Sequence, residues 1–253
     1  MSRLLSQDHP PVVRLQGLDL LRGLAMLWMA AYHFCFDLNL MGLWEPRQSF
    51  FRDPFWYLQR TGIVSLFLFC VGLSMALALG AGQSWQRFWR RWAQVAVCAA
   101  LVSLGSALMF PSTWISFGVL HGIAVMLILA RLMAPLKNWL WPLGALAMLL
   151  PNWLAHPFFD TPYTHWVGLV TRPPRTEDWV PVLPWLGVLL WGLAAGQWLM
   201  RLPAQAALVR RLSEVPARLL PVVRLGQWPL LFYMLHQPIL LGGLQLGRSL
   251  GAW

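Results

Sequence analysis

The sequence predicts an all-α protein that crosses a membrane several times, and three observations support this. Hydrophobic residues make up 58% of the chain and charged residues only 11%, whereas soluble domains carry about 25% charged residues. The mean hydropathy is +0.56. Apolar residues run on in long stretches instead of alternating with polar ones, which is typical of membrane helices and not of membrane strands.

Several apolar stretches are long enough for a helix to cross a bilayer, which takes about 20 residues. The third and fourth are separated only by Pro-Ser-Thr, so we expect a tight helical hairpin there. The fifth is short and contains Pro142 and Pro151. Without internal repeats or a soluble segment, residues 1–253 are expected to form one membrane domain. The predicted spans are 18–41, 55–80, 93–111, 113–134, 138–155, 180–200 and 226–247.

Positive charges between the spans predict the orientation, because cytoplasmic loops are enriched in Arg and Lys. With the N-terminus in the cytoplasm, the cytoplasmic segments hold about twice as many of these residues as the opposite segments. This favours seven spans with the C-terminus outside. The cytoplasmic set is Arg3, Arg14, Arg87, Arg90, Arg91, Arg131, Lys137, Arg201, Arg210, Arg211, Arg218 and Arg224.

The formal net charge of +10 does not indicate nucleic-acid binding, because the arginines gather at the ends of apolar stretches and Lys137 is the only lysine. Cys35, Cys70 and Cys98 all lie inside apolar stretches without metal-ligand spacing. We interpret them as core residues. The long segment 152–181 is expected to form an ordered cap on the outer face, where its aromatic residues suit either a sugar acceptor or a membrane-interface belt.

The first predicted span carries four ionisable residues in the stretch LDLLRGLAMLWMAAYHFCFDL. A helix turns about 100° per residue, so Arg22 and His33 lie on one stripe, roughly 16 Å apart along the axis. Asp19 precedes Arg22 by three residues and Asp37 follows His33 by four, which places them on the same side. Because charge in a bilayer costs about 2.5–3.5 kcal/mol per residue, this face is expected to turn towards a polar cavity.

A carboxylate beside an imidazole fixes its tautomer and raises the basicity of its other nitrogen. The spacing of His33 and Asp37 therefore indicates a catalytic base and the group that orients it. Asp19 and Arg22 equally suit a simple anchor pair at the membrane boundary. Arg22 is also a candidate to bind an anionic cosubstrate, together with Arg87, Arg90 and Arg91, although topology alone accounts for that arginine cluster equally well.

Two further histidines, His121 and His236, lie within the fourth and seventh predicted spans. With His33 they can converge in one cavity at comparable depth, although each alone suits a hydrogen-bonded packing residue. Together with Tyr32 and Tyr233 they are our candidates for a substrate pocket. No metal site is expected, since no pair of histidines has the short helical spacing of a metal motif.

Residues 14–42, RLQGLDLLRGLAMLWMAAYHFCFDLNLMG, resemble the opening of the heparan-alpha-glucosaminide N-acetyltransferase catalytic-domain family, in particular its small bacterial members. Later stretches continue the resemblance in order, including LFLFCVGLSMALAL at 66–79, FGVLHGIAVMLIL at 117–129, PWLGVLLWGLAAG at 184–196 and FYMLHQPIL at 232–240. The ten residues between Arg22 and His33 are also similar to the Arg-x10-His signature of the wider membrane acyltransferase superfamily.

The resemblance implies transfer of an acetyl group from cytoplasmic acetyl-CoA to an acceptor across the membrane, with His33 as the catalytic histidine. The family's small bacterial members imply a location in a bacterial inner membrane. On the lysosomal relative the acceptor is a terminal glucosamine of heparan sulfate. That acceptor is not carried over, because the chain has fewer predicted spans and differs around the histidine. The expected partners are acyl-CoA, an extracytoplasmic glycan-like acceptor bearing an amine or hydroxyl, and the bilayer. A homodimer is one assembly that the sequence allows.

Two other functions remain open at the level of the sequence. Intramembrane Asp and His also occur in proton relays, so a proton-coupled transporter or flippase is the alternative. Seven spans do not divide into two equal repeats, which weakens the usual transporter design. A membrane protein without chemistry is the third possibility, against which stands the cost of burying Asp37 beside His33.

Overall fold

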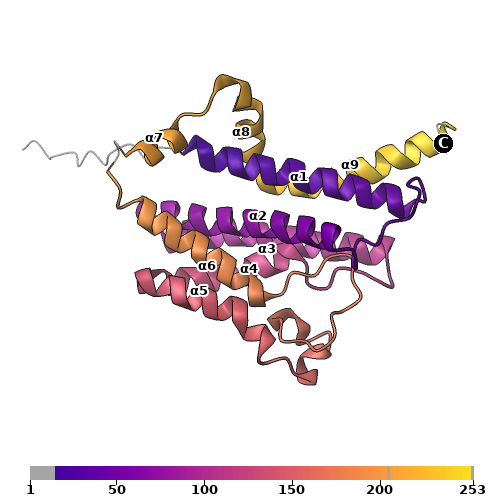
Figure 1. Ribbon diagram of the computed structural model, residues 1–253, viewed down its shortest axis with the longest axis horizontal. Helices are drawn as coiled ribbons and strands as arrows, with labels where there is room; N and C mark the ends of the chain where they lie inside the picture. Colours follow the sequence, from indigo (N-terminus) through magenta and orange to yellow (C-terminus); the bar gives the residue numbers. More distant parts are fainter. Residues whose placement is uncertain (1–14, 204–205, 252–253) are drawn as a thin grey trace, which may run out of the picture.

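The computed structural model describes residues 15–203 and 206–251, which form a helical bundle (Figure 1). Arg3 and Arg14, which contribute to the predicted orientation, lie outside the described residues. The α-helices are α1 Gln16–Leu40, α2 Pro54–Gly80, α3 Trp85–Met109, α4 Val119–Met133, α5 Leu140–Leu149, α6 Val182–Leu199, α7 Ala207–Ser213, α8 Leu220–Gly226 and α9 Pro229–Ser249. Short 3-10 turns are η1 Ala134–Trp139, η2 Leu150–Asn152, η3 Pro157–Asp160, η4 His165–Val167 and η5 Ala217–Leu219.

The all-helical prediction is confirmed for the described residues, in which the only β pairing is an isolated bridge between Phe117 and Trp179. Four helical stretches within 15–203 and 206–251 are long and apolar enough to cross a membrane: α2, α3, the stretch Val119–Asn152 and α6. The helices α1 and α9 have 25 and 21 residues, but polar side chains interrupt their apolar character. The count of seven spans and the cytoplasmic N-terminus remain predictions.

The predicted fourth and fifth spans correspond to two helices that run in opposite directions. Their connection, η1, contains Lys137 at φ 51°, and it packs at the end of α6, where the Gln197 side chain donates to the Ala134 carbonyl. The α5 helix has only ten residues, about 15 Å, so the predicted span 138–155 is too long. Pro151 lies in η2 directly after it, where a missing N–H and a fixed φ favour the end of an α-helix.

The hairpin expected between the third and fourth spans exists, but its connection is longer than Pro-Ser-Thr. The backbone N–H of Glu177 donates to the Thr113 carbonyl, and Val180 N–H donates to Phe117 O. These bonds hold residues 110–118 in extended and turn conformations, so α4 begins at Val119 and not at 113. The Asp178 carboxylate accepts from the Val119 N–H at 2.7 Å, which satisfies one of the orphan donors of the helix start.

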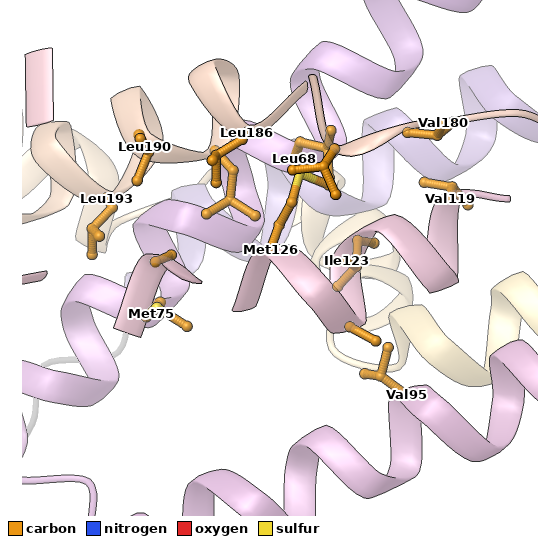
Figure 2. Packing of buried hydrophobic residues seen from close by; sticks show 14 of the residues in the cluster. Leu68, Met75, Val95, Val119, Ile123, Met126, Val180, Leu186, Leu190 and Leu193 are labelled. Carbon is orange, nitrogen blue, oxygen red and sulfur yellow. The ribbon is translucent and has the colours of Figure 1, made fainter. Parts of the chain in front are cut away.

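The most extensive helix packing in the bundle joins α2 and α6, and glycines lie within it. A side chain at Gly72 would strike the Leu189 backbone carbonyl, and one at Gly192 would strike that of Phe69. Around this contact lies the largest buried apolar cluster, in which Leu68, Met126 and Leu190 are nearly inaccessible (Figure 2). The glycines therefore let the two backbones approach closely, as small residues do at membrane helix interfaces.

The helices α8 and α9 bring the end of the chain back to α1, on the side away from α5 (Figure 1). Gly23 of α1 packs on Val222 of α8, and Gly226 packs on the Asp19 backbone carbonyl. The bundle has two distinct ends. We call the end with residues 81–91, 131–139 and 197–201 the arginine-rich end, and the end with residues 41–53, 110–118 and 152–181 the loop end. Hydrogen bonds such as Arg131 to Gln83 and Arg60 to the Trp179 carbonyl hold each end together.

Candidate active site

The polar face predicted for α1 lies against the last two helices. Arg22 makes an ion pair with Asp19 at 2.9 Å and donates to the Gly226 carbonyl at 3.0 Å, between α1 and α8. His33 and Asp37 face α9 instead. The helical periodicity therefore placed the four residues correctly on one face, and the fold divides them into two groups. One group is an anchor pair near the start of α1, and the other is a set of polar contacts with α9.

His33 is bonded to a second histidine. Its Nδ1 atom lies 2.8 Å from Nε2 of His236, and the two rings stack with their centroids 5.0 Å apart. The Nδ1 atom of His236 is 2.7 Å from the Tyr233 backbone carbonyl, which can only accept a hydrogen bond. Neutral His236 therefore carries its proton on Nδ1, and its Nε2 accepts from Nδ1–H of His33. This order leaves the Nε2 lone pair of His33 available to take a proton.

Asp37 does not bond to His33, contrary to the pairing that the spacing of four residues indicated. Both of its carboxylate oxygens accept from Nε2 of Gln237, at 2.9 and 3.1 Å, and the residue is 1% exposed. Gln237 follows His236 on α9, so the two pairs are neighbours between the same helices. The Gln237 Oε1 atom is buried and has no hydrogen-bond partner among the described residues. Sequence reasoning missed Gln237, because its partner lies 200 residues away.

His121 makes its hydrogen bonds away from α9. Its Nε2 lies 3.1 Å from the Ser103 hydroxyl of α3, and its Nδ1 accepts from the Gly118 N–H at the start of α4. His121 therefore joins α3 to the start of α4, and its place in a common cavity with the other two histidines stays a prediction. Tyr32, also a pocket candidate, packs edge-on against His33, Phe50 and Trp56. Within the described residues no three His, Cys, Asp or Glu side chains gather as a metal site.

A cavity of about 350 Å³ lies between α1, α2, α3, α4 and α9. Its volume is at the lower end of the range for small-molecule sites, about 300–1,000 Å³. Gln83 and Arg91 line it at the arginine-rich end, and Tyr233 lines it next to the histidine pair. Most of the remaining lining is apolar, including Phe67, Val71 and Leu127. Arg22 also lines the cavity, whereas Arg87 and Arg90 are exposed on the outer surface of α3 and do not.

The arginine-rich mouth of this cavity is fixed by a buried cation. Arg131 of α4 donates to the side chain and the backbone carbonyl of Gln83, both at 3.0 Å. Its guanidinium carbon lies 4.2 Å from the Trp85 ring centre and 4.7 Å from that of Phe88. These contacts hold the α2–α3 turn against α4, so they position Gln83 and the first turn of α3.

The loop end is closed by a hydrogen-bonded network that sequence reasoning did not resolve. Arg60 of α2 donates to the Trp179 carbonyl at 2.8 Å, and the Trp179 indole donates to Nδ1 of the buried His165. Burial lowers the pKa of His165. Burial also raises the pKa of Asp178, while the Arg60 guanidinium acts in the opposite direction. The sequence offered one indication of this network, which is the charged Arg60 inside an apolar stretch.

Fold and site together define a helical membrane protein with a polar centre between its first and last helices. Comparison with known families makes the class more specific. The sequence profile described as heparan-alpha-glucosaminide N-acetyltransferase, catalytic, matches residues 14–238, and the chain therefore belongs to this family. The family points to a membrane acetyltransferase. No curated protein and no solved structure was found to match the chain.

Proposed function

We propose that the protein transfers an acetyl or other short acyl group from cytoplasmic acyl-CoA to an amine or hydroxyl of an extracytoplasmic, glycan-like acceptor. The observation that carries the proposal is the hydrogen-bond chain from His33 through His236 to the Tyr233 carbonyl. It leaves one imidazole lone pair of His33 for the acceptor's proton, and the His236 ring of the same chain contacts Tyr233, which lines the cavity. Family membership supplies the acetyl chemistry, and the chain supplies the base.

In this proposal the donor occupies the cavity from the arginine-rich end. The apolar lining suits the acyl group and the thiol arm of the coenzyme, while Arg91 and Arg22 supply positive charge for phosphate oxygens. Arg87 and Arg90 lie outside the cavity, so they contact only a part of the coenzyme that remains at the surface. A cytoplasmic position of this end agrees with the predicted orientation of the chain.

The acceptor approaches on the His33 side. His33 does not line the cavity, but it is bonded to His236, whose ring centroid is 5.6 Å from that of Tyr233. The acceptor nitrogen or oxygen attacks the thioester carbonyl carbon while Nε2 of His33 removes its proton. The positive charge that forms on His33 is shared through Nδ1–H with His236. The buried pair of Asp37 and Gln237 lies one helical turn further along α1.

The test is acetyl-CoA binding and thiol release by the purified protein in detergent, for the parent and for His33→Ala. Glucosamine serves as a probe that offers a nucleophilic amine. N-acetylglucosamine serves as a probe whose nucleophilic groups are hydroxyls only. We expect saturable acetyl-CoA binding in both proteins and acceptor-dependent thiol release only in the parent. Absence of acetyl-CoA binding by folded parent protein would remove the donor and favour proton-coupled transport.

A matched pair of arginine variants tests the donor site itself. Arg91→Gln is expected to weaken acetyl-CoA binding by about tenfold or more, the value of a hydrogen bond to a charged group. Arg90→Gln, one residue earlier on α3 and outside the cavity lining, is expected to change the Kd much less. Equal effects of the two variants would contradict the assignment of the cavity to the donor.

A further inference from the structure

The polar side chains that line the cavity differ in how their hydrogen bonds are used. Ser74 donates to the Cys70 carbonyl, and the Trp92 indole donates to the Ala124 carbonyl. Gln83 accepts from Arg131, Arg91 donates to Gln94, and Arg22 is bonded to Asp19 and Gly226. Among the polar side chains that line the cavity, only that of Tyr233 makes no hydrogen bond to another described residue. The Tyr233 oxygen is not one of the fully buried polar atoms without a partner in the described residues, so it keeps some accessible surface.

Tyr233 connects the cavity to the histidine pair. Its side chain lines the cavity, and its backbone carbonyl accepts from Nδ1–H of His236 at 2.7 Å. The rings of Tyr233 and His236 have centroids 5.6 Å apart. The position of one residue on α9 therefore fixes the histidine tautomer and places a phenol in the space proposed for the donor. A phenol hydroxyl without a protein partner is a donor available to a ligand.

We propose that the Tyr233 hydroxyl is a catalytic residue that donates a hydrogen bond to the thioester carbonyl oxygen of the acyl donor. This inference rests on the proposed function. The acceptor lone pair forms the new bond to the carbonyl carbon, and the C=O π electrons move onto the oxygen. The Tyr233 O–H then stabilises this oxyanion. When the C=O bond re-forms, the C–S bond breaks, and the coenzyme thiolate takes the proton that His33 removed. The products are the acylated acceptor and free coenzyme thiol.

The apolar surroundings strengthen this hydrogen bond in the transition state. Phe67, Leu120 and Ile123 line the same cavity, so little water is available to solvate a developing oxyanion there. A neutral donor costs less to bury in such a place than a cation does. Arg91 lines the cavity at its arginine-rich end, where the phosphates are proposed to bind, whereas Tyr233 lines it beside the histidine pair. The tyrosine is therefore the polar lining group on the side where the carbonyl oxygen is proposed to lie.

The experiment compares Tyr233→Phe with Tyr57→Phe in detergent, with thiol release from acetyl-CoA and glucosamine as acceptor. Tyr57 is an exposed residue near the start of α2 and lies outside the cavity, so its variant should match the parent. Removing one oxyanion donor typically lowers kcat by about 10²- to 10³-fold. We expect this loss for Tyr233→Phe, with the Kd of acetyl-CoA within about threefold of the parent because the lost bond forms mainly in the transition state.

A kcat of Tyr233→Phe within about threefold of the parent would overturn the inference, and so would a change confined to KM. If Tyr233→Phe does not fold, 3,5-difluorotyrosine at position 233 provides the test. It keeps the shape of the side chain and makes the phenol more acidic. The inference then requires the alkaline loss of kcat to move to lower pH, since only the protonated phenol donates. An unchanged profile would overturn it. A folded parent without acetyl-CoA turnover would instead contradict the proposed function on which the inference rests.

Discussion

The Nδ1 atom of His33 lies 2.8 Å from Nε2 of His236, across the contact between the first and last long helices. The two residues are 203 positions apart in the chain, and the hydrogen bond between them couples their tautomers. Because the Tyr233 carbonyl holds the His236 proton on Nδ1, the pair has one arrangement of protons when neutral. The histidine proposed as the base thereby has a fixed tautomer without a carboxylate in contact.

Substitutions of His236 should separate its positioning role from simple packing. His236→Leu removes the acceptor of the His33 Nδ1–H, and we expect kcat to fall by at least about tenfold, up to the 10²- to 10⁴-fold typical of losing the base itself. His236→Gln retains an acceptor oxygen, so it should recover part of the loss. The measurement is thiol release with acetyl-CoA and glucosamine. Equal activity of the two variants would show that the hydrogen bond is not the relevant property.

Gln237→Leu should destabilise the protein because it leaves the buried Asp37 carboxylate without its hydrogen-bond donor. The expected loss in the free energy of unfolding is about 1–3 kcal/mol. Asp37→Asn should cost less, since an amide at position 37 can donate to the Gln237 Oε1 that has no partner in the described structure. Thermal unfolding in detergent measures both effects. A larger loss for Asp37→Asn than for Gln237→Leu would show that the negative charge itself is required.

The close contact of α2 and α6 predicts opposite results for two glycines. Gly192→Ala places a methyl group against the Phe69 backbone carbonyl, and overpacking of this kind costs about 1–3 kcal/mol. Gly105→Ala in α3 meets no atom within 4 Å, so the better helix propensity of alanine should stabilise it by up to about 1 kcal/mol. The apparent Tm of each variant in the same detergent is the measurement. A lower Tm for Gly105→Ala than for Gly192→Ala would contradict this packing.

The loop end should lose stability in mild acid through His165. Its pKa is lowered by burial, so the folded state binds fewer protons than the unfolded state. The stabilising contribution of neutral His165 is complete above about pH 6.5 and is lost as the pH falls from there towards the lowered folded pKa. Protonated Nδ1 would also face the indole N–H of Trp179, which is 3.1 Å away.

Thermal unfolding at pH 7.5 and pH 5.5 tests this expectation. We expect His165→Gln to reduce the acid-induced decrease in apparent Tm relative to the parent. His156→Gln, an exposed histidine of the same loop segment, is the matched control and should keep the parent's decrease. If both variants lose stability in acid as the parent does, the acid sensitivity arises elsewhere in the molecule.

The sequence by itself determined the helical class of the protein, the family resemblance and the shared face of Asp19, Arg22, His33 and Asp37. Those features are local: hydropathy and the helical turn decide them within about 20 residues. It also located α1, α2 and α6 to within two residues at each end. The start of α4 was not predicted correctly, because hydrogen bonds from residues 177–180 hold the preceding segment outside the helix.

Only the tertiary structure decided which polar groups meet. It pairs His33 with His236 and Asp37 with Gln237, assigns His121 to the α3–α4 contact, and separates Arg91 in the cavity from Arg90 outside it. Each choice depends on how helices distant in sequence cross, which glycine contacts such as Gly23 with Val222 set through backbone packing. No local pattern encodes such a crossing, because it follows from the fit of two surfaces.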